Sequence, residues 1–86
     1  MTYNIEVKKS VLKVLKKIPR EDQIHIAKTI KGLADDPRPA YCLKLAGSAY
    51  YRIRCGNYRI IYDVQDDKLI IIILKVGHRK DIYKRK

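Results

Sequence analysis

Residues 50–64, YYRIRCGNYRIIYDV, carry the sequence pattern of a β-hairpin, two antiparallel strands joined by a tight turn. Apolar and polar residues alternate in the first part of this stretch, as they do in a strand with one buried face. The dipeptide Gly56-Asn57 is of the type that fits a two-residue hairpin turn. The pattern therefore predicts strands over residues 50–55 and 58–64, and these strands decide the fold of the chain.

The predicted turn places three arginines on one face of this hairpin. A two-residue loop sets Arg54 opposite Arg59, and Arg52 shares their face because side chains alternate along a strand. Like charges in opposite positions destabilise a hairpin by up to about 1 kcal/mol, whereas guanidinium groups side by side can bind phosphate. Two interpretations stay open: a phosphate-binding face, or a surface network with nearby carboxylates. The candidate carboxylates are those of Asp63, Asp66 and Asp67.

The rest of the chain predicts an α+β fold of two layers in the order β-α-α-β-β-β. The 86 residues have room for one domain, residues 1–86, in which a helical hairpin packs on a mostly antiparallel four-stranded sheet. In chain order, we expect a strand at 3–7, a helix from Lys9 to Pro19, a second helix ending at Asp36-Pro37, a connector at 37–49, the hairpin, a central strand at 68–76, and a short helical turn within 78–86.

The positive charge is large and clustered. Twenty Lys and Arg against nine Asp and Glu give a net charge of +11. One cluster runs along the predicted first helix, where residues 8–20 contain no acid. Residues 75–86 contain six more bases and one acid. Clustering of this kind indicates a polyanionic partner such as a nucleic acid. The basic residues of the first cluster that we assign to nucleic-acid binding are Lys9, Lys13, Lys16, Lys17 and Arg20.

Several other classes of protein do not fit this sequence. The longest aliphatic run, residues 69–74, is too short to span a membrane. The first ten residues lack the apolar segment of a signal peptide, so we expect a cytoplasmic protein. Two cysteines form neither a disulfide framework nor a zinc site, and no phosphate-binding loop or metal-ligand spacing occurs. We therefore expect no metal and no cofactor.

The C-terminal residues add groups that suit RNA cleavage. Arg79 and Lys80 follow the predicted central strand, and His78 and Tyr83 lie beside them in sequence. Cleavage without a metal needs a base for the 2′-hydroxyl proton, cations for the charged phosphorane, and an acid for the leaving oxygen. The arginine cluster and this tail together can supply such groups.

The sequence resembles the RelE/ParE toxin superfamily along essentially its whole length. The resemblance rests on the basic first helix, ADDPRP, LKLAGS, YYRIRCGNYRIIYDV and the terminal VGHRKDIYKR, and YRIRCGNYRIIY and GHRKDIY are its most specific parts. The chain is more similar to the RelE branch, toxins of type II toxin–antitoxin systems that cleave mRNA in the ribosomal A site. The resemblance implies a metal-independent endoribonuclease that inhibits translation.

The same resemblance implies roles for individual residues. Arg59 and Arg79 match arginines that would act as transition-state cations, and Tyr83 matches a tyrosine that would orient the nucleotide. Arg52 and Arg54 stand where RelE toxins have two basic residues, commonly lysines. Because arginine does not readily act as a base, both would bind phosphate here, and His78 becomes the alternative candidate for the base.

The resemblance also implies partners. A RelB-like antitoxin would wrap the toxin, which would be monomeric by itself and form a hetero-oligomer with the antitoxin. The lysines of the first helix and Lys80 would contact ribosomal RNA, mainly through phosphates. The A-site mRNA would be the substrate, and no membrane would be involved.

Two other functions remain open from the sequence. One is a ParE-like inhibitor of DNA gyrase, which would not need Arg52, Arg54, Arg59, Arg79 and Tyr83 together. The other is an RNA- or DNA-binding module without catalysis, which would bind in a salt-sensitive way and leave the nucleic acid intact.

Overall fold

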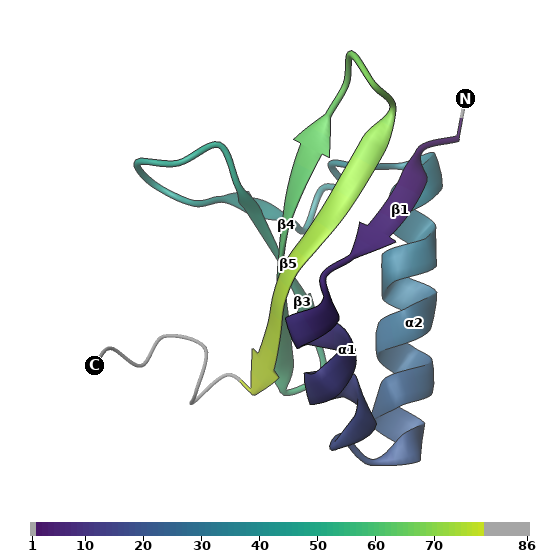
Figure 1. The fold of residues 1–86 in the computed structure, drawn as a ribbon. Helices are drawn as coiled ribbons and strands as arrows, with labels where there is room; N and C mark the ends of the chain where they lie inside the picture. The colour runs from purple at the N-terminus through teal and green to yellow at the C-terminus, as the bar shows by residue number, and fades with distance from the viewer. Residues whose placement is uncertain (1, 79–86) are drawn as a thin grey trace.

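The computed structural model describes residues 2–78 and has the order β-α-α-β-β-β-β (Figure 1). Its elements are β1 (Asn4–Val7), α1 (Lys9–Lys16), α2 (Arg20–Asp35), β2 (Leu43–Lys44), β3 (Tyr51–Cys55), β4 (Tyr58–Gln65) and β5 (Ile70–His78). The α+β class is confirmed. The helical turn expected within residues 78–86 falls outside the described residues, apart from His78, which ends β5.

The sheet has five strands in the order β1-β5-β4-β3-β2, where the sequence predicted four. Only β1 and β5 pair in parallel; every other neighbouring pair is antiparallel. The additional strand, β2, lies within the predicted connector and pairs through Leu43 and Lys44 alone. Two residues between a proline-rich segment and a glycine loop are too few to show a strand periodicity. β5 is central, as its apolar character on both faces predicted.

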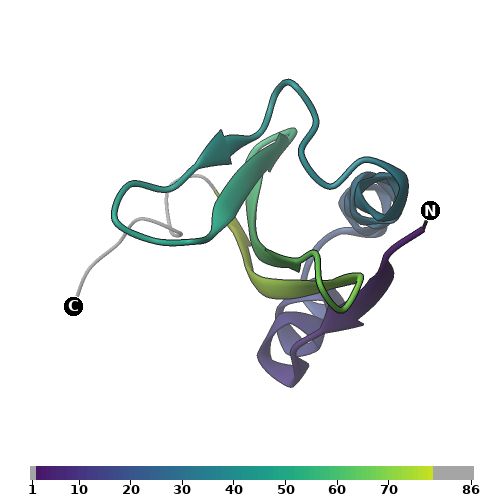
Figure 2. The same ribbon diagram turned by 90° about the horizontal axis from the view of Figure 1, so that it is seen from above.

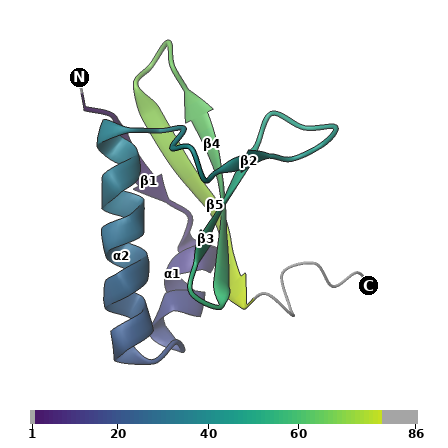
Figure 3. The ribbon, with the colours of Figure 1, turned by 180° about the vertical axis from the view of Figure 1, so that it is seen from behind.

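The two helices lie on one side of the curved sheet, and the loop between β2 and β3 projects away from them (Figures 1, 2 and 3). α1 ends at Lys16, three residues before the end that the sequence predicted at Pro19, and α2 begins at Arg20, directly after that proline. Glu21 and Asp22 occupy the first turn of α2, where the helix dipole favours negative charge. Gln23 joins the two helices by donating a hydrogen bond of 2.7 Å from Nε2 to the carbonyl oxygen of Ile18.

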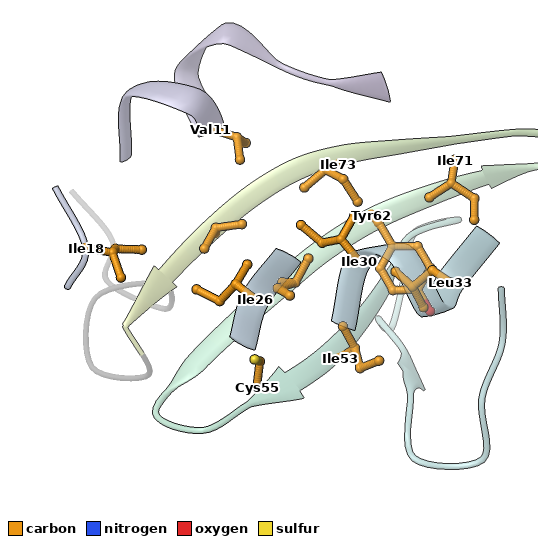
Figure 4. Packing of buried hydrophobic residues seen from close by; sticks show 12 residues of the cluster. Val11, Ile18, Ile26, Ile30, Leu33, Ile53, Cys55, Tyr62, Ile71 and Ile73 are labelled. Atoms are coloured by element: carbon orange, nitrogen blue, oxygen red, sulfur yellow. The ribbon is translucent and has the colours of Figure 1, made fainter. Parts of the chain in front are cut away.

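The hydrophobic core fills the space between the helices and this face of the sheet (Figure 4). Apolar side chains spaced by three and four residues along α2 are buried, as the sequence predicted. The buried residues that make up the core are Val11, Ile18, Ile26, Ile30, Leu33, Ile53, Cys55, Ile60, Tyr62, Ile71, Ile73 and Val76. Tyr62 is the largest fully buried side chain of the described residues and donates a hydrogen bond of 2.7 Å from its hydroxyl to the Pro37 carbonyl oxygen. In the described part of the chain, neither helix is long and apolar enough to cross a lipid bilayer.

Candidate functional site

The predicted hairpin register is confirmed. Arg54 is opposite Arg59, and Arg52 is opposite Ile61. The two-residue turn is made possible by Gly56, whose φ of 60° suits glycine. Residues in opposite positions share a face of the sheet, and Ile53 and its partner Ile60 are buried under the helices. The three arginines therefore lie on the opposite face, which we call the arginine face.

Arg59 is the unusual member of the arginine face. It is only 8% exposed, and among the described residues its Nε has no hydrogen-bond partner. Its Nη1 donates one long hydrogen bond of 3.4 Å to the carbonyl oxygen of Tyr58. A buried donor without a partner costs about 1–3 kcal/mol, and more when it is charged. Arg54, directly opposite, is exposed. The hairpin thus holds one buried and one exposed guanidinium side by side, an arrangement suited to an anionic ligand.

Among residues 2–78, the carboxylates do not neutralise this pair. Asp66 binds Arg38 through two hydrogen bonds, of 2.7 and 3.2 Å, and also accepts one from the hydroxyl of Tyr3. The Arg38 guanidinium and, after it, the Tyr3 hydroxyl hold the pKa of the Asp66 carboxyl below its usual value. Within residues 2–78, neither Arg54 nor Arg59 forms an ion pair with a carboxylate. Of the two interpretations of the arginines, the anion-binding face fits these two residues.

The arginine face continues onto β5, where His78 is the one residue that the sequence predicted for the site. Gly77 is opposite Arg59, so no side chain of that strand covers the guanidinium from this position. Lys75 is opposite Ile61 and is exposed, which adds an amine to the same face. An irregularity in the pairing at Ile61 and Tyr62 shifts the register of β5 by one residue. The sequence gives no clear sign of this shift, so it could not reveal which β5 side chains join the arginines.

His78 lies on the other face of the sheet. It is opposite Tyr58, and the two rings meet edge to face with centroids 5.7 Å apart. A cavity of about 350 Å³ adjoins this pair and is lined in part by Val14, Lys17 and Ile18. Partial burial, together with nearby Asp22, raises the pKa of the Tyr58 hydroxyl. The structure therefore does not bring the His78 imidazole together with the arginine face.

The remaining predicted site residues divide into two groups. The five bases assigned to RNA binding at α1 and the start of α2 are all exposed: Lys9, Lys13, Lys16, Lys17 and Arg20. No acid lies in the first turn of α1, so the helix presents a solvent-facing basic surface. Arg79, Lys80 and Tyr83 lie outside the described residues. Within residues 2–78, no three His, Cys, Asp or Glu side chains are grouped so that they could hold a metal ion.

Comparison with known proteins identifies the family. Residues 5–83 match the family described as the ParE toxin of the type II toxin–antitoxin system parDE. The chain belongs to the RelE/ParE superfamily of toxins. This toxin is 38% identical to a protein of Methanocaldococcus jannaschii named as toxin RelE1, over 98% of both chains.

Solved structures of RelE proteins have the same fold as this RelE/ParE toxin. The archaeal RelE–RelB complex from Pyrococcus horikoshii contains a chain with a TM-score of 0.84 and 32% identity, covering 94% of this toxin and 99% of that chain. The RelBE toxin–antitoxin complex from Escherichia coli gives a TM-score of 0.77 and 26% identity, covering 88% and 95%. The fold and the family are thus the ones that the sequence resemblance implied.

Proposed function

We propose that this toxin is a ribosome-dependent mRNA endonuclease that cleaves in the A site and so inhibits translation. The 2′-oxygen of one nucleotide attacks the adjacent phosphorus, and the bond to the 5′-oxygen of the next nucleotide breaks. The products are a 2′,3′-cyclic phosphate and a 5′-hydroxyl. A base takes the proton of the 2′-hydroxyl, and an acid gives a proton to the leaving oxygen, so the reaction needs no metal.

One observation carries the proposal: the buried, incompletely bonded guanidinium of Arg59 beside the exposed guanidinium of Arg54. Cations fixed in a partly dry site stabilise a charged transition state better than cations in water do. Arg59 would stabilise the phosphorane, and Arg52 and Arg54 would bind the phosphates of the mRNA. Arg79 and Tyr83, outside the described residues, keep their proposed roles as second cation and nucleotide-orienting ring.

The reaction needs a base for the 2′-hydroxyl proton. His78 stays our candidate because imidazole accepts a proton near neutral pH. Its backbone is adjacent to Gly77 and so to Arg59, whereas its ring lies beside Tyr58 on the helix side. The pH–rate profile of the variant His78→Gln tests the role. An unchanged rate and profile would remove His78 from the mechanism.

The partner that we propose is a RelB-like antitoxin. The similar chains from Pyrococcus horikoshii and Escherichia coli were solved in complexes with RelB. With a charge of +11 and an exposed basic surface on α1, this toxin suits a partner with acidic segments that cover these bases. The same surface would contact ribosomal RNA when the antitoxin is absent.

The test is mapping of mRNA 5′ ends after incubation with purified ribosomes, with free mRNA as the control. We expect new 5′-hydroxyl ends in the A-site codon for the wild type, and a loss of about 10²–10³-fold in rate for Arg59→Ala. Arg38→Ala is the matched variant, since it removes an arginine that binds Asp66 and lies outside the arginine face. The absence of new ends with folded wild-type protein would overturn the proposal.

The name of the matching family gives a second candidate, inhibition of DNA gyrase as in ParE toxins. A gyrase inhibitor does not need the arginine face as a reaction centre. Growth inhibition that survives the double variant Arg59→Ala, Arg79→Ala, together with inhibited DNA supercoiling, would favour this candidate over mRNA cleavage.

A further inference from the structure

Large apolar side chains are exposed next to the arginine face. Among the described residues, Tyr41, Leu43 and Tyr50 form half of the exposed large hydrophobic set, although they lie within one short stretch of chain. Tyr41 is 67% exposed and Leu43 is 55% exposed. Solitary exposed apolar residues are ordinary on protein surfaces, but a group of them beside charged residues marks a contact site.

A surface cavity joins these apolar residues to the arginines. It has a volume of about 300 Å³ and is lined by Ala40, Tyr41, Leu43, Arg52 and Arg54. The pairing of β2 with β3 sets Leu43 opposite Arg52, so the two side chains share a face of the sheet. One side of the cavity is therefore aromatic and aliphatic, and the other side carries guanidinium groups.

These two sides match the two parts of a nucleotide. A base in single-stranded RNA stacks on an aromatic ring, and its phosphate binds a guanidinium group. We propose that the cavity binds the nucleotide next to the cleaved phosphate, with the base on Tyr41 and Leu43 and the phosphate on Arg54. Tyr41 is then a positioning residue, and this inference rests on the proposed mRNA cleavage.

A protein segment is the competing occupant of the cavity. RNA is favoured because the cavity is continuous with the arginine face through Arg54, which is opposite Arg59 and forms no ion pair within residues 2–78. A phosphate on Arg59 thus places the neighbouring nucleotide toward β2. A purely apolar segment would match only the Tyr41 and Leu43 side of the cavity and would make no use of the guanidinium group of Arg54.

The test measures single-turnover cleavage on ribosomes that carry a synthetic mRNA. For Tyr41→Ala, we expect the half-saturating toxin concentration to rise about tenfold, the range that base–aromatic stacking gives, with the saturated rate changed less than twofold. Tyr41→Phe keeps the ring and should behave as the wild type. Ile24→Ala is the matched control, since Ile24 is also half exposed but lies on α2. Thermal unfolding verifies that each variant is folded.

A second set of measurements identifies which nucleobase the cavity binds. An mRNA with an abasic nucleotide on one side of the cleaved phosphate should weaken wild-type binding about tenfold and leave Tyr41→Ala unaffected. The two flanking positions are tested separately. Independent losses at both positions, or a Tyr41→Ala variant that behaves like Ile24→Ala, would overturn the inference while cleavage itself stands.

A third set of measurements distinguishes failure of this inference from failure of the proposed mRNA cleavage. Binding of a non-cleavable 2′-O-methyl RNA to the isolated toxin is measured at low salt for the same variants. If the wild type does not cleave mRNA, the proposed function fails. The binding of the 2′-O-methyl RNA to the variants then tests the inference by itself. A Tyr41→Ala variant that binds this RNA normally but loses affinity for an antitoxin would assign the cavity to the protein partner and overturn the inference.

Discussion

The two faces of the β3–β4 hairpin differ in their chemistry: one packs into the hydrophobic core, and the other carries closely spaced positive charges. On the helix side, Ile53, Ile60 and Tyr62 are fully buried and packed. On the other side, Arg54 and Arg59 stand opposite each other without a carboxylate to pair with among the described residues. Because strand side chains alternate, one sequence stretch serves both faces at once.

This contrast shows which face of the hairpin stabilises the fold and which face destabilises it. The helix side stabilises the protein by removing apolar surface from water. The arginine face opposes folding through like charges in opposite positions and through a buried donor without a full set of partners. Residues 59 and 60, neighbours in sequence, therefore offer a matched pair of substitutions with opposite expected results.

The largest effect should come from the helix side. Ile60→Ala removes a fully buried side chain and leaves a cavity, which should lower the free energy of unfolding by about 2–5 kcal/mol. Urea denaturation followed by circular dichroism measures this change. Cleavage per folded molecule should stay near the wild-type value. A loss of cleavage at full folding would show that the two faces are not separable.

The reverse result is expected for Arg59→Met. Removing the incompletely bonded guanidinium should raise the free energy of unfolding by about 1–3 kcal/mol, because a buried donor no longer lacks its partners. The same variant should lose A-site cleavage. Denaturation and 5′-end mapping are measured on one preparation. A destabilised Arg59→Met protein would mean that the guanidinium supports the fold, and the contrast between the faces would fail.

A smaller effect distinguishes two tyrosines that are opposite each other in the hairpin. Tyr62→Phe leaves the partly buried Pro37 carbonyl without the hydroxyl of Tyr62 and should cost about 1 kcal/mol of unfolding free energy. Tyr51→Phe is the control, because the Tyr51 hydroxyl accepts its hydrogen bond from Arg38 in an exposed setting. If urea denaturation showed the same decrease in the free energy of unfolding for both variants, the assigned difference in burial between the two hydroxyl groups would be wrong.

The smallest effect should be a dependence of stability on pH. Arg38 holds the pKa of the Asp66 carboxyl below its ordinary value of about 3.9, so the unfolded chain takes up this proton first as the pH falls. The contribution is therefore complete above about pH 5 and is lost as the pH falls through and below the ordinary pKa. Asp66→Asn should flatten the fall of the denaturation midpoint in this range, whereas Asp67→Asn, in the same turn, should not. Parallel curves for the two variants would exclude the Arg38 contact as the cause.

Much of the fold could be predicted from local patterns. The hairpin register followed from Gly56-Asn57, and the two ends of α2 followed from Pro19 and Pro37, since each of these residues restricts its own neighbourhood. The strand β2 could not be predicted, because its two residues are held by pairing with β3 and not by their own periodicity. Long-range contacts decide such short elements.

The candidate site was predicted less completely than the fold. The sequence placed three arginines on one face, but it could not tell that Arg59 would be buried and Arg54 exposed. It also extended the site to His78, which the register of β5 places beside Tyr58 on the other face. The position of a side chain at the end of a strand depends on every irregularity before it, and the shift at Ile61 and Tyr62 is one of these.

The parallel pairing of β1 with β5 also bears on how this toxin is made. Residues 4–7 pair with residues 70–73, which lie 66 positions further along the chain. A nascent polypeptide can build α1, α2 and the β3–β4 hairpin early, yet the sheet stays unfinished until its last strand has left the exit tunnel. The position opposite Arg59 is filled by that same late strand, so the arginine face is complete only after residues 70–78 have been synthesised.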